Sequence, residues 1–304
     1  MRTTAGRVPG HVRHPLAALA AANLVYAGAF PASEVALRGM GPFTLAGMRF
    51  VIAAAVLSPI AIPVLRGMGR ADLLRLAPIA AVGLWGQMVL IYFGINQSNS
   101  AIAAIIVGLE PVLIALWAAL LLHERFGRRS GLGLGIGLAG SLLVAGLGRS
   151  DGASALGLAL LLGTGLAFSW YTVASKSFLG RFSPLELTAV ISTLGAVWAL
   201  VPMLSEIALA DGIQHPGART WLLVVYLGVG NSVIGYVLWN RALQGLPAAA
   251  VGASLYAQPV LGAGLSWLLL RDPLPATFLP GAVLVLAGVY VASSARTRAD
   301  PPGL

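Results

Sequence analysis

The chain has 304 residues, of which 19 are Lys or Arg and 10 are Asp or Glu, so that 10% are charged, against about 25% in soluble proteins. With 58% apolar residues and 38 glycines, the composition is typical of a membrane protein and excludes a soluble globule or a disordered chain. The absence of Cys also excludes a disulfide-stapled domain and thiolate metal sites.

Apolar runs long enough to cross a hydrocarbon layer of about 30 Å as helices recur from end to end. We expect ten such helices, over residues 16–32, 43–65, 73–96, 100–122, 131–147, 154–178, 185–208, 221–243, 248–270 and 277–294. Spanning β-strands would instead be short segments of alternating polarity. The sequence therefore predicts an all-α membrane protein with ten transmembrane helices.

The basic residues between these runs set the expected orientation, because cytoplasmic loops retain Lys and Arg. With the N-terminus inside, the inner loops and tails carry Arg2, Arg7, Arg13, Arg66, Arg70, Arg75, Arg125, Arg128, Arg129, Lys176, Arg181, Arg241, Arg296 and Arg298. The outer loops carry Arg38, Arg149, Arg219 and Arg271. We therefore place both termini in the cytoplasm, and the net charge of +9 requires no nucleic acid or other acidic partner.

Two stretches of the chain resemble each other. A shift of 148 residues aligns 109–113 and 120–124 with 257–261 and 268–272, and it aligns Gly133 with Gly281. A shift of 142 residues aligns Pro42 with Pro184. These alignments indicate that the chain consists of two units of five helices each.

An odd number of helices makes the second unit enter the membrane from the opposite side, which predicts an inverted repeat about a pseudo-twofold axis in the membrane plane. We expect a cytoplasmic segment at 1–14, a first repeat at 15–148, a second repeat at 149–295 and a cytoplasmic tail at 296–304. Inverted halves can alternate between inward-open and outward-open cavities, a device that secondary transporters use.

The order of several short motifs resembles the drug/metabolite transporter superfamily, specifically its ten-helix EamA-type exporters. The fourth and ninth helices each carry a proline and end in an acid, from Glu110-Pro111 to Glu124 and from Pro259 to Asp272. An Arg49-Phe50 pair lies in the second helix, and residues 238–243, LWNRAL, close the eighth. This resemblance implies export of amino acids and related metabolites through a central cavity. Asn23 and Tyr26 stand where smaller relatives have a first-helix carboxylate, so their proton coupling cannot be carried over.

Glu110 is the acid that this reading places near the bilayer centre, about midway along the fourth helix. An ionisable group there is expensive and therefore a functional candidate, as partner of a substrate ammonium or as a proton carrier for coupling. The alternative is a structural carboxylate that is hydrogen-bonded to a neighbouring helix or paired with Arg49. Its repeat counterpart Gln258 cannot titrate, so a site between the two would be asymmetric and suit a zwitterion.

Arg49 lies about six residues into the second helix, close enough to the outer surface for its side chain to snorkel to the headgroups. We expect it to be a structural anchor. Glu186, Glu206 and Lys176 lie near helix ends and are expected to be interfacial, with no assigned role.

Aromatic and amide residues at mid-depth form the remaining candidates, because Trp and Tyr inside a membrane need a polar neighbour. With Glu110, the expected substrate-binding set comprises Tyr26, Trp85, Gln87, Tyr92, Trp170, Tyr171, Asn231, Ser232, Tyr236, Tyr256 and Gln258. A cavity lined by rings and a few amides favours an apolar or aromatic amino acid over a sugar phosphate. The alternative for each residue is ordinary helix packing.

Other motif matches carry no chemistry. Gly135-x-Gly137-x-x-Gly140 lies inside an apolar helix with no preceding strand, so we interpret its small residues as a close helix contact. No phosphate-binding loop, zinc-protease motif or nucleophile elbow is present. We therefore expect no enzyme activity, no cofactor and no metal.

The sequence favours a bacterial inner-membrane carrier that exports small organic solutes, chiefly amino acids or related metabolites, by alternating access. The alternatives are a carrier or flippase of lipid-linked or nucleotide-linked sugars, which would favour a cavity with several cations, and a non-transporting membrane enzyme or scaffold. The expected partners are the solute and the lipid bilayer, with a monomer as the expected unit.

Overall fold

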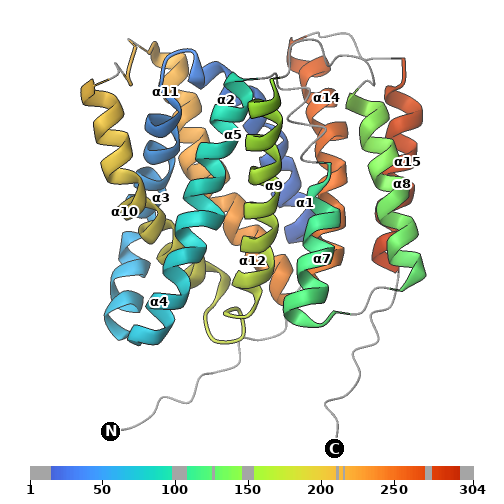
Figure 1. The fold of residues 1–304 in the computed structure, drawn as a ribbon, viewed down its shortest axis with the longest axis horizontal. Helices are drawn as coiled ribbons and strands as arrows, with labels where there is room; N and C mark the ends of the chain where they lie inside the picture. Colours follow the sequence, from blue (N-terminus) through green and yellow to red (C-terminus); the bar gives the residue numbers. More distant parts are fainter. Residues whose placement is uncertain are drawn as a thin grey trace, which may run out of the picture.

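The computed structural model describes residues 15–97, 108–124, 127–145, 154–209, 212–214, 216–270 and 276–294. Within these ranges the chain is helical, and the β-type contact there is an isolated antiparallel bridge between Met40 and Ile213. The helices run roughly parallel to one another as a bundle (Figure 1). The predicted all-α class is confirmed for the described residues.

The first half of the sequence forms α1 (Pro15–Ala27), α2 (Ala29–Leu37), α3 (Pro42–Gly67), α4 (Arg70–Pro78), the π-helical segment η1 (Ile79–Gly86), α5 (Gln87–Asn96), α7 (Glu110–Leu122) and α8 (Arg128–Ala145). The second half forms α9 (Ala155–Lys176), α10 (Pro184–Leu209), α11 (Ala218–Val225), the π-helical η2 (Tyr226–Gly235), α12 (Tyr236–Gly245), α13 (Ala248–Ala253), the 3₁₀ turn η3 (Ser254–Tyr256), α14 (Ala257–Leu270) and α15 (Phe278–Ser294).

Six described helical stretches are long and apolar enough to span a membrane: Pro15–Leu37, Pro42–Gly67, Arg70–Asn96, Ala155–Lys176, Pro184–Leu209 and Ala218–Gly245. The other four predicted ranges hold α7, α8, the α13 to α14 stretch and α15. The first span continues to Leu37, beyond the predicted end at residue 32. Most of the first half of the predicted helix 100–122 lies outside the described residues, and α7 begins at Glu110.

Local sequence signals explain where several helices begin. Pro42 begins α3, a position where the missing N–H of proline costs nothing. Ser183 and Glu186 form a capping box at the start of α10, in which Ser183 N–H donates to Glu186 Oε2 (2.8 Å) and Glu186 N–H donates to Ser183 Oγ (3.2 Å). Glu186, expected to have no role, therefore fixes the start of a span.

Helices of the two predicted repeats pack against each other in three pairs, namely α3 with α10, α7 with α13, and α8 with α15. The repeat makes the first and third pairs equivalent, whereas its counterpart of α7 is α14, the helix that follows α13. In the first pair, Thr44 near the start of α3 donates its N–H to Glu206 near the end of α10 (2.6 Å). In the second, Glu124 just after α7 accepts from the N–H of Ala248, the first residue of α13 (3.1 Å). The two helices of each of these pairs are therefore antiparallel.

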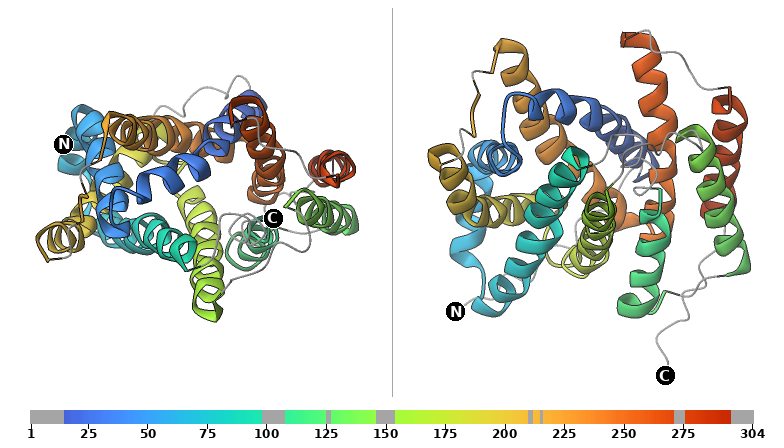
Figure 2. Two further views of the ribbon diagram at one scale, coloured as in Figure 1. Left: turned by 90° about the horizontal axis from the view of Figure 1, so that it is seen from above. Right: turned by 45° about the horizontal axis from the view of Figure 1, so that its top comes forward.

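The helices of the third pair, α8 and α15, lie side by side at one lateral edge of the bundle (Figure 2). A Cβ added at Gly288 would lie only 2.6 Å from Gly137 Cα, and one added at Gly140 would lie 2.6 Å from Val285 N. Larger residues at these two positions would push the helices apart. The predicted close contact of small residues is confirmed, and the order of its contacts makes this pair antiparallel as well.

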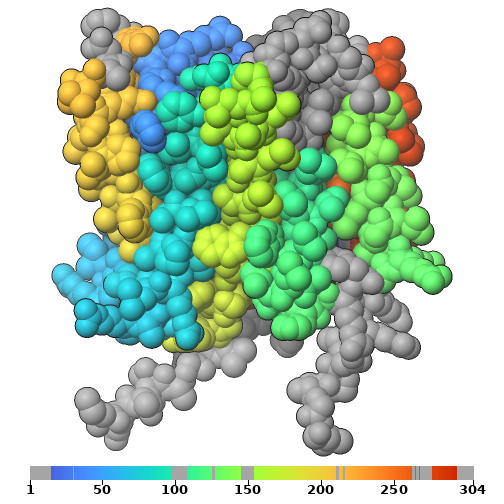
Figure 3. Space-filling view, in the orientation of Figure 1, coloured from blue at the N-terminus to red at the C-terminus, as the bar shows by residue number. Residues whose placement is uncertain are grey.

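Apolar side chains cover much of the outside of the bundle. Helices α7 and α9 face the viewer in Figure 3. Leu116 and Leu120 are exposed on α7, and Leu162 and Leu166 are exposed on α9. Exposed leucines at this density are unfavourable in water and suited to lipid. Together with the apolar spans, this surface supports a multi-pass membrane protein.

Candidate functional site

A cavity lies inside the bundle, between elements of both halves of the sequence. Its lining comes from α1, α2, α3, α5 and α7 and from α9, η2, α12, η3 and α14. The empty space among these side chains, including the part open to solvent, is about 580 Å³. The lining residues are Tyr26, Ala29, Ser33, Arg49, Gln87, Met88, Ile91, Tyr92, Ile95, Glu110, Phe168, Asn231, Tyr236, Leu255 and Gln258.

Arg49 of α3 is held at one side of this cavity by neutral acceptors. Its Nη1 donates to Tyr92 Oη (2.6 Å) and Met88 Sδ (2.9 Å) of α5. Its Nη2 donates to Asn231 Oδ1 (2.6 Å), while Nε (3.3 Å) and Nη2 (3.2 Å) both reach Ser232 Oγ of η2. These bonds fix the orientation of the guanidinium, but no described carboxylate pairs with it.

The expectation that Arg49 snorkels to the headgroups is wrong, because only 2% of the residue is exposed. Its acceptors lie on helices beside α3 in the bundle interior, so the side chain turns inward instead of along its helix toward the surface. A buried cation without a carboxylate partner is costly. The arrangement therefore leaves Arg49 able to gain stability from an anionic group in the cavity.

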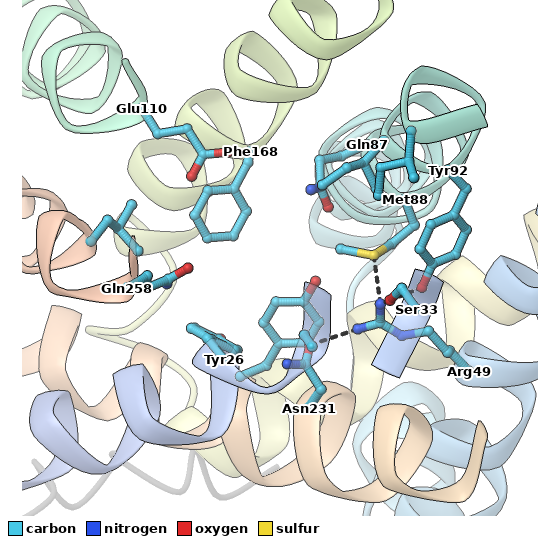
Figure 4. A pocket seen from close by; sticks show the side chains of 15 residues that line it. Tyr26, Ser33, Arg49, Gln87, Met88, Tyr92, Glu110, Phe168, Asn231 and Gln258 are labelled. Atoms are coloured by element: carbon cyan, nitrogen blue, oxygen red, sulfur yellow. Dashed lines mark hydrogen bonds between the residues drawn. The ribbon is translucent and has the colours of Figure 1, made fainter. Parts of the chain in front are cut away.

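Glu110 lies on the other side of the cavity, at the first residue of α7, with 4% of the residue exposed. Ser169 Oγ of α9 donates to its backbone carbonyl (3.3 Å), but within the described part of the chain no hydrogen bond or ion pair reaches its carboxylate. The expected alternative of a pair with Arg49 is therefore wrong for this structure. Figure 4 shows Glu110 and Gln258 on one side, Arg49 and Tyr92 on the opposite side, and the rings of Tyr26 and Phe168 between them.

Several buried polar atoms of the lining have no hydrogen-bond partner among the described residues. They are Tyr26 Oη, Gln87 Oε1, Asn231 Nδ2 and Tyr236 Oη. Asn231 is informative because its Oδ1 accepts from Arg49, which leaves its Nδ2 free to donate next to the cation. Unpaired buried groups are unfavourable, so these atoms provide hydrogen-bonding capacity for a bound molecule.

A cluster of five rings adjoins the cavity, formed by Tyr26, Phe168, Tyr171, Tyr236 and Trp239 and called the ring cluster below. Its contacting ring centroids lie 5.7 to 6.1 Å apart. Three of its members line the cavity, while Tyr171 and Trp239 do not and are fully buried. Tyr171 Oη also donates to Asn240 Oδ1 (3.3 Å), which connects α9 to α12 beside the ring cluster.

Seven of the predicted candidates line the cavity: Tyr26, Gln87, Tyr92, Glu110, Asn231, Tyr236 and Gln258. The other five do not line it. Ser232 accepts a hydrogen bond from Arg49, Tyr171 belongs to the ring cluster, and Tyr256 donates to Leu134 O (2.9 Å). Trp85 stacks on Phe43, and Trp170 packs against the core.

The sequence reading missed lining residues of two kinds. Ser33, Met88 and Phe168 are short or apolar, and a pattern of polar and aromatic residues does not separate them from ordinary core positions. Arg49 did carry a signal, because an ionisable residue inside a span is a functional candidate by default. The prediction that Arg49 snorkels to the surface relied on its position near the end of the second helix, and this position does not determine the direction of the side chain.

Comparisons with known proteins agree with this architecture. The model of the EamA-like transporter family matches residues 15–146 and again 155–294. An uncharacterized transporter of Archaeoglobus fulgidus is 28% identical, over 86% of this chain and 92% of its own length. A protein of Streptantibioticus cattleyicolor named as a probable terminal-alkyne amino-acid exporter is 29% identical, over 94% and 97%, respectively.

A solved crystal structure at 25% identity superposes with a TM-score of 0.74 and covers 92% of this chain and 96% of its own. Relatives and fold thus agree over nearly the whole sequence. Because the family model matches both halves of the sequence, the chain belongs to the EamA-like transporter family.

Proposed function

We propose that this transporter exports small amino-acid-like solutes across the bacterial inner membrane by alternating access through the central cavity. The observation that carries the proposal is the pair of buried, opposite and mutually unpaired charges, Arg49 and Glu110, on facing sides of that cavity. A solute carboxylate would gain a hydrogen bond from Asn231 Nδ2 and the electrostatic attraction of the adjacent Arg49 cation. A solute ammonium would gain a charge-assisted hydrogen bond from Glu110.

The chemistry of the lining supports a zwitterion over a sugar carrier. Arg49 is the single cation among the described lining residues, whereas a phosphate-bearing sugar would favour several. The rings of Tyr26, Phe168 and Tyr236 offer an apolar wall for a side chain. The relative of Streptantibioticus cattleyicolor is named as a probable terminal-alkyne amino-acid exporter, a name that agrees with the proposed export and with the proposed class of solute.

The three antiparallel helix pairs support an inverted repeat of five helices in each half, as does the double match of the family model. The π-helical segments add to this, because η1 in the third predicted helix and η2 in the eighth begin 226 − 79 = 147 residues apart. Two inverted halves around one cavity are an arrangement that many transporters use for alternating access.

The distribution of charge supports an orientation with the termini in the cytoplasm. The end of the bundle where α3, α7 and α9 finish, called the basic face below, carries Arg66, Arg70, Arg75, Arg128, Arg129, Lys176, Arg181 and Arg241. The opposite face carries Arg38 and Arg219 among the described residues. By the positive-inside rule the basic face is cytoplasmic.

Counterflow in proteoliposomes tests the solute class. Purified protein is reconstituted, loaded with one unlabelled amino acid, and supplied outside with the same labelled compound at low concentration. We expect labelled amino acid to accumulate transiently, and a zwitterion to compete better than its amine or carboxylate fragment. Accumulation no greater than in protein-free liposomes for every amino acid in a broad panel would refute the proposal.

A further inference from the structure

A second charged cluster lies away from the cavity, at the basic face. Glu124 follows α7, where His123 adopts a left-handed conformation (φ 54°) and turns the chain. The Glu124 carboxylate accepts from Lys176 Nζ at the end of α9 (2.9 Å) and from the N–H of Ala248 at the start of α13 (3.1 Å). Its other oxygen lies 3.5 Å from the N–H of Ala249.

Lys176 completes the cluster by donating to Leu246 O as well (2.8 Å), just before α13. One carboxylate and one ammonium thus connect α7 of the first half of the sequence to α9 and α13 of the second. The exposed fractions of the two side chains are 14% for Glu124 and 22% for Lys176. Partial burial makes this network less sensitive to solvent screening than a surface ion pair.

The cluster lies between the cavity and the basic face. On α7, Glu110 lines the cavity and Glu124 follows 14 residues later, a separation of about 20 Å along a helix axis. On α9, Phe168 lines the cavity and Lys176 lies two turns further. The buried rings of Tyr171 and Trp239 adjoin the cavity without lining it, so a solute moving to the basic face must displace helices there.

We infer that Glu124 and Lys176 form the latch that holds the transporter closed at the basic face, and that the latch must open in every transport cycle. The helices that it joins, α7 and the α13 to α14 stretch, carry Glu110 and Gln258 of the cavity. Releasing the start of α13 from Glu124 would therefore allow these two helices to separate at the basic face.

A second ion pair at the same face provides a matched control. Arg181, between α9 and α10, donates to Asp72 of α4 at 2.8 Å through Nη1, and hydrogen bonding and charge attraction from Asp72 raise the pKa of Arg181. The Arg181 side chain is 60% exposed and the Asp72 side chain 11%, and the contact is bidentate because Nη2 also donates to Asp72 Oδ2. Within the described part of the chain the pair bonds to neither α7 nor α13, so its loss should leave the two helices that Glu124 joins in place and barely change the closed state.

The experiment uses the absence of Cys in the native chain. A single cysteine is placed in the cavity lining by Ala29→Cys, and its modification by a membrane-impermeant thiol reagent is measured in vesicles of both orientations. We expect Glu124→Gln and Lys176→Met each to increase the rate of modification from the basic face by about five- to tenfold and to decrease it from the opposite face. Arg181→Gln should change either rate less than about twofold.

Folding is checked for each variant by its elution in detergent and its thermal transition. Should Glu124→Gln not fold, Lys176→Met carries the test, because Glu124 then keeps its bond to Ala248. Unchanged modification from the basic face in folded Lys176→Met protein overturns the latch. The readout needs no solute, so a failure of this inference is distinct from a failure of the proposed solute class.

Discussion

The two charged sides of the cavity are built in opposite ways. Arg49 is held by four neighbouring side chains that accept from every one of its N–H groups. Glu110 is equally buried, yet no described side chain contacts its carboxylate through a hydrogen bond or an ion pair. One side is organised before a solute arrives, whereas the other depends on what enters the cavity.

This difference suggests different roles for the two residues. A guanidinium that is fixed in advance loses little conformational freedom on binding, which favours affinity and orientation. A buried carboxylate without a partner gains most from a cation or a proton. We therefore expect Arg49 to set which solutes bind and Glu110 to respond to the charge and proton state of the cavity.

Replacing Arg49 should have the largest effect. Arg49→Gln removes the cation that would bind a solute carboxylate and leaves Tyr92 and Asn231 without their partner. The variant loses the attraction between the cation and the solute carboxylate, and it loses the bond that orients Asn231. At about 1.5–3 kcal/mol for each contact that involves a charged group, counterflow should decrease by about 100-fold or more. Arg49→Lys keeps the charge without the planar donor set and should retain an intermediate activity.

The thermal transition of both Arg49 variants must be measured alongside counterflow, because the same bonds join α3 to α5 and η2. A stable Arg49→Gln protein with near-native counterflow would show that Arg49 is purely structural. Solute binding would then not depend on the Arg49 side of the cavity.

Glu110→Gln should be the next largest change. The amide keeps the size of the carboxylate and leaves no bonded partner behind, so the fold should be preserved. The apparent affinity for solutes with a cationic group should fall by about 10- to 100-fold, while competition by a carboxylate without an amine should be unaffected. If transport is coupled to protons through Glu110, the variant should also lose its dependence on pH, and an unchanged pH profile would remove Glu110 from coupling.

A series of isomeric solutes sharpens the comparison without changing the protein. The 2-, 3- and 4-aminobutyrates have the same atoms but place the ammonium progressively farther from the carboxylate. Because Arg49 and Glu110 lie on opposite sides of the cavity, we expect 4-aminobutyrate to compete about tenfold better than 2-aminobutyrate, the value of one charge contact. The preference should disappear in Glu110→Gln, and a preference for 2-aminobutyrate would mean that both solute charges bind on one side.

Much of the fold was predictable from the sequence, because apolar runs of spanning length and the capping residues leave few alternatives in a membrane. A close helix contact at Gly137 and Gly140 followed from the small residues of this segment, whereas the structure identifies α15 as the partner. Breaks inside spans were harder to predict, since the π-helical segments and the 3₁₀ turn at Ser254–Tyr256 have no distinct periodicity. Their geometry depends on neighbouring helices as well as on local sequence.

The site was predictable only in part, because depth in the membrane does not determine the direction of a side chain. Trp85 and Tyr92 are seven residues apart in one predicted helix, a spacing that places both on one face of a regular α-helix, yet Tyr92 contacts Arg49 whereas Trp85 stacks on Phe43. Trp85 lies in the π-helical segment η1 and Tyr92 in α5. A π-helical segment changes the angular spacing along the helix, so regular helical spacing does not predict the directions of these two rings.

Because Trp85 and Tyr92 have different surroundings, a substitution of Trp85 should have the smallest effect and serves as a control for the other variants. Trp85→Phe keeps an aromatic ring against Phe43, with which Trp85 stacks at 6.4 Å between centroids. It removes an indole N–H for which the described part of the chain provides no acceptor. Because Trp85 does not line the cavity, counterflow should change less than about twofold, within the range of conservative core substitutions. A loss similar to that of Glu110→Gln would mean that the cavity reaches Trp85 in another state of the cycle, and the contrast between the two charged sides would then describe only the state seen here.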